Sequence, residues 1–346
     1  MYFASDNSGP MHPAVAQAMI AVDTGFQPSY GTDPILDGVR TQIRELFEAP
    51  EAAVYLVATG TAANALALAT MAQPWDAVFC TPLAHINVDE CHAPEFYTGG
   101  AKLSLVGSGD KMTSEQLRAR IEGWGKGDVH TSQRGPVQVT QVTEMGRLYT
   151  LDELHALTSV ARDYDLPTFM DGARFANALV ALDCTPADMT WKAGINALSL
   201  GGTKNGCAGV EAVIFFDPKH AWEFELRRKR GAHLFSKHRY LSAQMQGYLE
   251  DGIWLQAARA ANANAARLAE GLRDVPDLKF VEEPEANMIF ATLSRRQHQR
   301  LQAAGAVYGI WGELDGDPEE RLMMRLVCDW SITHEMIDAF VALAKG

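Results

Sequence analysis

The sequence lacks the motifs of the commonest nucleotide-binding proteins. No GxxxxGK[ST] occurs, so a Walker A phosphate loop is excluded, and there is no GxGxxG dinucleotide fingerprint. Apolar runs such as ALALATMA are too short to span a bilayer. The first residues, MYFASDNSGPMHP, have neither the basic region nor the apolar core of a signal peptide. We therefore expect neither a P-loop protein nor a membrane protein.

Paired cysteines and an excess of basic residues are also missing. The cysteines are five in number, an odd count, and none has CxxC or zinc-ribbon spacing: Cys80, Cys91, Cys184, Cys207 and Cys328. This pattern favours a reduced, cytoplasmic compartment. Lys and Arg number 30 against 43 Asp and Glu, a formal charge of −13. That balance argues against nucleic acid or an anionic membrane as the main partner.

What the chain does contain is a regular alternation of strand-like and helix-like segments. Strands are predicted at 52–58, 166–171, 195–201 and 210–217, and helices at 61–72 and 150–165. Thr150 and Glu153 have the spacing of a capping box at the start of the second helix. A βαβα rhythm predicts an α/β fold with a mainly parallel sheet flanked by helices.

The rhythm changes after about residue 218. WEFELRRKRGAH and the long stretch from LSAQMQGYLEDG to EGLRDV read as helical, and short strands such as NMIFATL and RLMMRLVC follow. We predict a large α/β domain over 1–235, with the N-terminal segment contributing to the site, and a smaller α+β domain over 236–346. A chain of 346 residues is long enough for both.

Three features are expected at the carboxyl edge of the parallel sheet, where ligands of such folds bind. Thr59-Gly60-Thr61 follows a strand and opens a helix, a place suited to a phosphate. Asp171 ends one strand, and Lys204 follows another within SLGGTKNG. Each alone has an ordinary interpretation: a strand–helix turn, an ion pair with Arg174, or a surface turn. Together they are the parts that pyridoxal 5′-phosphate (PLP) needs: an anion site, an acid for the pyridine nitrogen and a lysine.

These residues resemble a known family. The segments SDN, ATGTAAN, HINVDECHAPEF, MDGARFANA and GGTKNG are similar to those of PLP-dependent L-threonine aldolases, members of the fold-type I aminotransferase superfamily. The resemblance runs from about Ser5 to Asp329 and is closest to the bacterial low-specificity threonine aldolase and L-phenylserine aldolase branch. It implies a large domain with a mainly parallel, mixed sheet, a small α+β domain, and cleavage of β-hydroxy-α-amino acids to glycine and an aldehyde.

The resemblance also implies roles for individual residues. Lys204 matches the lysine that carries the cofactor, and Asp171 the partner of the pyridine nitrogen. The other implied roles are phosphate binding by Gly60 and Thr61, ring stacking by His85, substrate-carboxylate binding by Ser5, Arg174 and Arg325, and further cofactor contacts by Arg174, Tyr30 and Lys229. In the family, the tyrosine at the position of Tyr30 reaches the site of a neighbouring subunit.

One position departs from the pattern of many relatives. Glu144 stands near the end of a strand where they have a histidine that is a candidate for handling the substrate hydroxyl. The proton-transfer role of that histidine cannot be transferred to this chain. His85 is our first candidate for the base, with assistance from Asp89, because the two lie within one helical turn by sequence.

Other interpretations remain open. Another fold-type I enzyme, such as a β-eliminating lyase or an aminotransferase, would share Lys204 and Asp171. From a different class, His85, Asp89 and His92 on a helix could hold a metal in a hydrolase. A binding protein that keeps the fold without catalysis is a third possibility. The sequence does not separate threonine from phenylserine as substrate, nor a dimer from the homotetramer, a dimer of dimers with shared sites, that the resemblance implies.

Overall fold

The computed structural model describes residues 1–346 and contains two β-sheets. The larger sheet has seven strands in the order β1-β7-β6-β5-β4-β2-β3. Their bounds are β1 (Ala53–Val57), β2 (Asp76–Cys80), β3 (Lys102–Leu105), β4 (Gln133–Thr140), β5 (Thr168–Gly172), β6 (Ala197–Gly201) and β7 (Glu211–Phe215).

The strands from β3 to β6 run parallel, and only β7 runs antiparallel to its neighbours β6 and β1. The parallel register pairs Thr140 with Asp171 and Asp171 with Ser199. The carboxyl ends of β4, β5 and β6 therefore lie side by side. The predicted mainly parallel, mixed sheet is confirmed.

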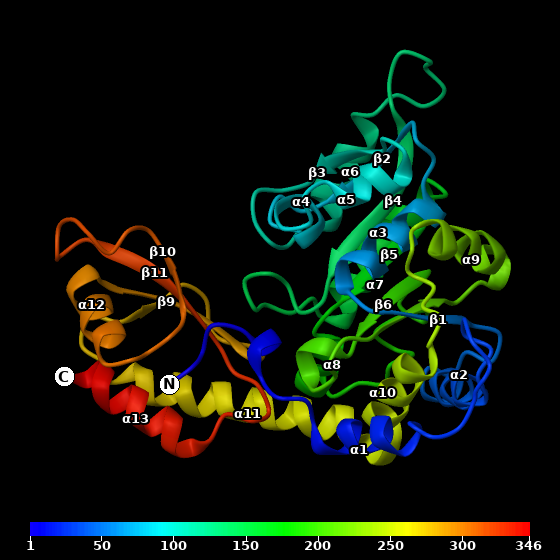
Figure 1. The fold of residues 1–346 in the computed structure, drawn as a ribbon. Helices are drawn as coiled ribbons and strands as arrows, with labels where there is room; N and C mark the ends of the chain where they lie inside the picture. Colours follow the sequence, from blue (N-terminus) through cyan, green and yellow to red (C-terminus); the bar gives the residue numbers. More distant parts are fainter.

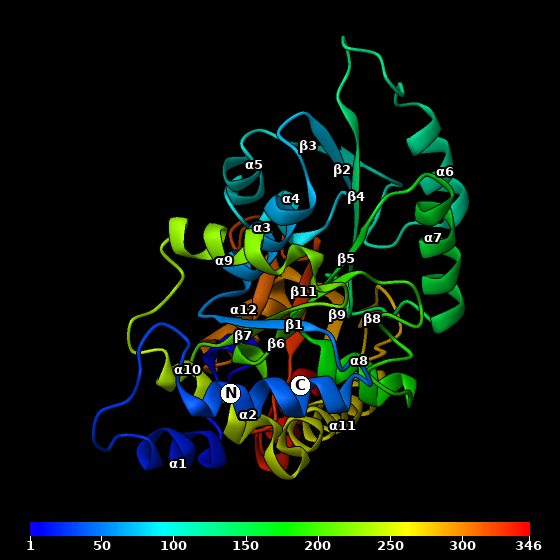
Figure 2. The same cartoon turned by 90° about the vertical axis from the view of Figure 1, so that its right-hand side faces the viewer.

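Helices cover both faces of this sheet, with α3, α5 and α9 on one side and α6 and α7 on the other (Figure 2). Strands β1, β5, β6 and β7 are buried on both faces, which accounts for their largely apolar composition. The helices of this part are α1 (Pro13–Ala21), α2 (Pro34–Leu46), α3 (Gly60–Met71), α4 (His85–Val88), α5 (Ala93–Thr98), α6 (Ser114–Glu122), α7 (Leu151–Asp163), α8 (Phe175–Leu182) and α9 (Ala221–Arg230).

Side-chain caps set where two of these helices begin. The Thr59 hydroxyl accepts a hydrogen bond from the amide of Ala62 and caps α3. Thr150 and Glu153 form the predicted capping box at the start of α7. Such caps satisfy amides that have no partner within the helix, so they fix the helix start. The start of α3 lies directly after β1.

The C-terminal part forms a second, antiparallel sheet in the order β10-β11-β9-β8. Figure 1 shows this sheet apart from the larger one, with α11 (Ile253–Arg273) running beneath both. Its elements are β8 (Lys279–Phe280), β9 (Met288–Ser294), β10 (Gly309–Trp311), β11 (Arg321–Val327), α12 (Arg295–Ala303) and α13 (His334–Lys345).

The long helical stretch predicted near residues 241–275 is two helices. α10 (Arg239–Leu249) and α11 (Ile253–Arg273) are separated by a short break at which Asp251 and Gly252 have positive φ angles of 53° and 68°. A left-handed backbone cannot continue a right-handed helix. α10 packs on α1 and α2, and α11 packs on α8 and α13. The predicted domain boundary at residue 235 stays a prediction.

The N-terminal segment joins the two parts of the molecule. Phe3 is buried in the core of the smaller part, where its backbone pairs with Val307 and Val327. The 3-10 helix η1 (Asp6–Ser8) then contacts η2 (Thr203–Asn205), which follows β6. Within the chain, no helix combines the length and apolarity needed to cross a membrane.

Candidate active site

A cavity lies at the carboxyl ends of β4, β5 and β6, as the strand order predicts. It brings together five of the predicted residues: Gly60, His85, Asp171, Arg174 and Lys204. The other lining residues are Asn64, Thr140, Val142, Glu144, Ala173, Ser199 and Glu211. Residues from α3, α4 and three strand ends thus meet at one place although they are far apart in the sequence.

Lys204 lies in η2, and both flanks of this short element are fixed. The side-chain amide of Asn205 donates 2.8 Å hydrogen bonds to the Tyr248 hydroxyl and the Trp254 carbonyl. The carboxylate of Glu211 accepts from the amide of Gly202 at 2.9 Å. Burial, aided by the positive charge of Arg174, lowers the pKa of Lys204. A lowered pKa increases the neutral fraction of the amine, which is the form that attacks a carbonyl carbon.

Glu211 is a second unusual group beside this lysine. Burial raises its pKa to about 7, although the amide of Gly202 and the hydroxyl of Thr203 donate to it. We did not identify Glu211 from the sequence. A single charged residue in the otherwise apolar segment VEAVIFF was the available indication.

Asp171 is 2% exposed and is held by hydrogen bonds at both oxygens. Its Oδ1 accepts from the amide of Ala173 at 3.0 Å, and its Oδ2 accepts from the side-chain amide of Asn64 at 2.8 Å. The same Asn64 amide donates to Glu90 at 2.8 Å, and the Asn64 carbonyl accepts from the Ser199 hydroxyl at 3.0 Å. Asp171 is therefore a fixed, buried acid at the edge of the sheet.

Glu90, and not Asp89, contacts the His85 ring. The Nδ1 atom of His85 lies 2.8 Å from Oε1 of Glu90, and this hydrogen bond raises the pKa of His85. Asp89 is exposed, and its backbone amide donates to the His85 carbonyl at the end of α4. The sequence placed Asp89 beside His85 by assuming a continuing helix. The indication we missed was the adjacent acid in HINVDE.

The helix that would align His85, Asp89 and His92 as metal ligands ends too early. α4 stops at Val88, and both Cys91 and His92 have left-handed backbone angles. His92 is paired instead with Glu95 at the exposed start of α5. The spacing argument for three ligands on one helical face therefore does not apply.

Glu144 occupies the turn between β4 and α7. Its Oε1 accepts 2.8 Å hydrogen bonds from the backbone amide of His85 and from the Thr140 hydroxyl, whereas its Oε2 is buried without a partner. Burial raises the pKa of Glu144 to about 7. Asp171, which is nearby, acts in the same direction.

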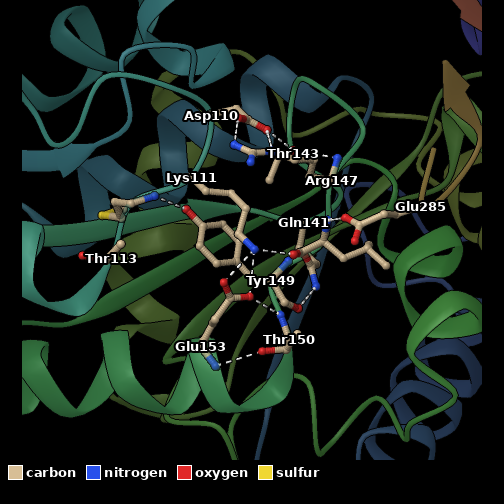
Figure 3. A network of polar contacts seen from close by, with 12 residues as sticks. Asp110, Lys111, Thr113, Gln141, Thr143, Arg147, Tyr149, Thr150, Glu153 and Glu285 are labelled. Carbon is tan, nitrogen blue, oxygen red and sulfur yellow. Dashed lines mark hydrogen bonds and ion pairs between the residues drawn. The ribbon is translucent and has the colours of Figure 1, made fainter. Parts of the chain in front are cut away.

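The turn that carries Glu144 is anchored from several sides (Figure 3). Arg147 pairs with the buried Asp110, and the Gln141 side chain makes two hydrogen bonds to the backbone of Tyr149. Glu285, from the C-terminal part, accepts from the amide of Leu148 at 2.6 Å. These contacts restrict where the Glu144 carboxyl can lie.

Arg174 is engaged by a carboxylate of the protein itself. Its Nε and Nη2 donate to the two oxygens of Asp6 at 2.7 and 2.9 Å, a bidentate pair. Asn287 also donates to Asp6 at 3.1 Å. Burial alone would raise the pKa of Asp6, but Arg174, Lys204 and Asn287 more than offset it and the pKa is lowered. We did not predict Asp6, which lies 168 residues from Arg174.

The other predicted carboxylate binders lie close to this pair. Ser5 caps η1 by accepting from the amide of Asn7. Arg325 donates from Nη2 to the carbonyl of Ala4 at 3.1 Å, while its Nε is buried without a partner. Two arginines therefore approach the N-terminal segment from the large and small sheets. A planar guanidinium group suits carboxylate recognition.

The remaining predicted residues divide into two groups. Gly60 and Thr61 form the first turn of α3, whose amino end opens on the cavity. Tyr30 and Lys229 do not line the cavity, and the Lys229 amine lies 4.6 Å from the centre of the Tyr30 ring. A role for these two in a neighbouring subunit's site, as the resemblance implies, remains a prediction.

The donor set fits PLP. A helix N-terminus that begins with glycine can hold a phosphate, because its amides point outward and no Cβ obstructs the approach. Asp171 supplies a buried carboxylate, and Lys204 an amine with lowered pKa. His85, with Asn64 and Glu90 behind it, presents a ring beside the same space. The residues present are those that the cofactor would require.

Comparisons with known proteins agree with this arrangement. A family model described as "Beta-eliminating lyase" matches residues 2–296. A low specificity L-threonine aldolase from Pseudomonas sp. (strain NCIMB 10558) is 40% identical over 304 residues, which cover 88% of this chain and 87% of that protein. A second, from Pseudomonas aeruginosa, is 38% identical over 337 residues, which cover 97% and 94%.

Solved structures extend the comparison. The threonine aldolase of Leishmania major superimposes with a TM-score of 0.92 at 25% identity, covering 99% of this chain and 98% of that one. Serine palmitoyltransferase of Sphingomonas wittichii has a TM-score of 0.73 at 15% identity, covering 100% and 86%, and shares the fold. The class is thus a fold-type I, PLP-dependent enzyme.

The chain belongs to the β-eliminating lyase family and is a PLP-dependent lyase related to threonine aldolases. The predicted fold class and cofactor are confirmed. The role of each individual residue stays a prediction, although five of the predicted residues line one cavity.

Proposed function

We propose that this enzyme cleaves L-β-hydroxy-α-amino acids of the L-threonine, L-allo-threonine and L-phenylserine type to glycine and an aldehyde. One observation carries the proposal. A lysine with lowered pKa, a buried aspartate and an arginine line one cavity at the sheet edge, as Lys204, Asp171 and Arg174 do. The likeness to low specificity L-threonine aldolases supports the reaction type.

Each residue has a task in this reaction. Lys204 would hold the cofactor through its amine, and the substrate amine would take its place. PLP supplies an electron sink for the pair left on Cα when a bond to that carbon breaks, and Asp171 is placed to keep the pyridine nitrogen protonated. Arg174 and Arg325 orient the substrate carboxylate, which decides which bond at Cα is aligned for cleavage.

The direct test is aldehyde and glycine release from L-threonine, L-allo-threonine and L-phenylserine, with and without added PLP. Lys204→Ala is expected to abolish turnover and the visible absorbance of the lysine-bound cofactor, because no other amine lines the cavity. The Lys192→Ala variant, which changes an exposed lysine on the surface, is the matched control. Near wild-type turnover by Lys204→Ala would disprove the assignment of this lysine.

The family description itself favours a second candidate, β-elimination. The same lysine, aspartate and arginine would serve that reaction, because it also begins by breaking a bond to Cα. The products separate the two: glycine plus an aldehyde for the aldol cleavage, ammonia plus a keto acid for elimination. L-Serine and L-threonine assayed for both product pairs decide between them.

We propose further that the protein is a cytoplasmic homotetramer, a dimer of dimers with sites shared between subunits. Its five free cysteines support a reducing compartment. Exposed apolar side chains on α5 and α9, namely Phe96, Trp222 and Leu226, support burial of this surface in an assembly. Mass photometry at decreasing concentration measures the state directly, and a monomer at micromolar concentration would contradict it.

A further inference from the structure

Two buried carboxyl groups line the cavity without a task in the reaction so far, Glu211 and Glu144. Glu211 is engaged with the loop that carries Lys204, through Gly202 and Thr203. Glu144 differs, because only its Oε1 is engaged, by the His85 amide and the Thr140 hydroxyl. Its Oε2 has no partner. Glu144 is therefore the carboxyl group with an oxygen left for a ligand.

Leaving a buried carboxylate oxygen without a donor has a free-energy cost, because the hydrogen bonds it would make to water are not replaced. The titratable groups that face Glu144 do not remove this cost. They are His85 from α4, Asp171 from β5, Cys80 from β2 and Tyr149 from the following segment. None of them donates a hydrogen bond to Oε2. A hydroxyl group on a bound ligand would supply the missing donor.

His85 is poorly suited to be the proton acceptor that we first predicted. Its Nδ1 is hydrogen-bonded to Glu90, and this bond raises the pKa of His85, which extends the protonated form to higher pH. A protonated imidazole has no free lone pair. The backbone amide of His85 instead holds Oε1 of Glu144, so that His85 helps to position the carboxyl group.

We propose that Glu144 is the catalytic base that takes the proton of the substrate's β-hydroxyl group through its free Oε2. This inference rests on the proposed aldol cleavage. The O–H electron pair becomes the second bond of the aldehyde carbonyl, and the Cα–Cβ pair stays on the glycine fragment. A proton is then added to Cα, so the substrate and the two products together contain the same number of protons.

The proposal predicts in which direction the cleavage rate changes with pH. Because burial raises the pKa of Glu144 to about 7, the carboxylate form is lost as the pH falls through that value. Cleavage should therefore weaken below about pH 7. A base with a pKa near the working pH combines availability with basicity, which suits it to proton transfer.

The test uses Glu144→Gln in the PLP-loaded enzyme. Glutamine can still accept from His85 and Thr140 but cannot take a proton. We expect kcat for L-threonine cleavage to fall about 100-fold or more. Hydrogen–deuterium exchange at Cα of glycine, which has no β-hydroxyl, should keep its wild-type rate. Cleavage at the wild-type rate, or equal loss of both reactions, would overturn the proposal. Glu282→Gln is the matched control, because Glu282 meets Arg147 on the outer side of the same turn.

A second variant, and a measurement on the cofactor-free protein, test the proposal without relying on the kinetics of Glu144→Gln. Thr140→Val removes one donor to Glu144, so the acid limb of kcat against pH should move to higher pH. In the cofactor-free protein, infrared difference spectra should show carboxyl groups titrating near pH 7, and Glu144→Gln should lose one of them while that of Glu211 remains. The proposal would be contradicted if the acid limb of Thr140→Val stayed at the wild-type pH, or if the infrared titration of Glu144→Gln matched that of the wild type.

These outcomes are distinct from failure of the proposed function. If the wild-type enzyme released no aldehyde from any of the three amino acids, the aldol assignment itself would be wrong. If it released aldehyde and Glu144→Gln did so equally well, only the role of Glu144 would be wrong.

Discussion

At the scale of single residues, Asp6 is the least expected neighbour of the cavity. It binds Nε and Nη2 of Arg174 and leaves Nη1 without a protein partner. A guanidinium group held on one side in this way keeps donors for a second carboxylate, that of the substrate. Asp6 is therefore a positioning residue for Arg174.

Asp6→Asn tests this arrangement. We expect KM for L-threonine to rise about tenfold, equivalent to about 1.4 kcal/mol, with a smaller change in kcat. The pKa of the free Lys204 amine should fall further, because the charge of Asp6 now raises it, and the pH dependence of amine modification in the cofactor-free protein measures that shift. Asn7→Ala, a change at the adjacent exposed position, is the control. A lower KM would show instead that Asp6 competes with the substrate carboxylate.

Several site residues could be predicted from the sequence because parallel strands deliver their ends to one edge. Lys204 and Asp171 are such cases. Asp6 is not, since its partner lies 168 residues away and no local pattern joins them. Helical spacing did not predict Glu90, because α4 ends at Val88. The chain turns there, so the carboxylate of Glu90 rather than that of Asp89 contacts His85.

At the scale of elements, the segment between β4 and α7 places Glu144. Capping rules predicted the start of α7, since Thr150 and Glu153 are close in sequence. The path of the preceding turn depends on Asp110 and Glu285, which come from distant segments, and it could not be predicted locally.

The pair between Asp110 and Arg147 should contribute to stability. Burial alone would raise the pKa of Asp110, but Arg147 and Thr143 more than offset it, so the pKa is lowered. We expect Asp110→Asn to lower the free energy of unfolding by about 2 kcal/mol at neutral pH, measured by urea denaturation. Asp163→Asn, in an exposed pair with Arg118, should cost about 0–1 kcal/mol.

The lowered pKa of Asp110 determines how the contribution of this residue to stability depends on pH. The contribution of Asp110 is fully present above its ordinary pKa of 3.8 and is lost as the pH falls through the lower value of the folded protein. The difference between wild type and Asp110→Asn should therefore shrink on acidification below that range. A difference that stayed constant would mean that the charge of Asp110 is not what stabilises the turn.

At the scale of the whole molecule, the first residues connect both sheets. Phe3 is 1% exposed in the core of the smaller part and stacks edge-on against Phe340 at 5.1 Å, while Asp6, three residues later, binds Arg174 of the larger part. The alternation of strands and helices predicted the large sheet. It did not predict this connection, because a short irregular segment has no periodicity.

Phe3→Ala should weaken both the stability of the protein and its binding of substrate, because Phe3 anchors the segment that connects the two sheets. We expect the free energy of unfolding to fall by about 3 kcal/mol from the cavity left in the core. KM for L-threonine should also rise, because the segment that carries Ser5 and Asp6 is loosened. Tyr2→Ala changes a half-exposed neighbour and should do neither. A loss of stability with unchanged KM would show that the packing of Phe3 does not position the residues of the carboxylate site.

The buried anchor at Phe3 has a practical consequence for handling the protein. A purification tag or fusion partner attached before Met1 would disturb a strand-like segment that is hydrogen-bonded to Val307 and lies directly before Asp6, the partner of Arg174. The opposite terminus ends at the exposed Gly346, after α13. Immobilisation on a biocatalyst support is therefore best made through Gly346, which leaves the amino end free to keep Asp6 against Arg174.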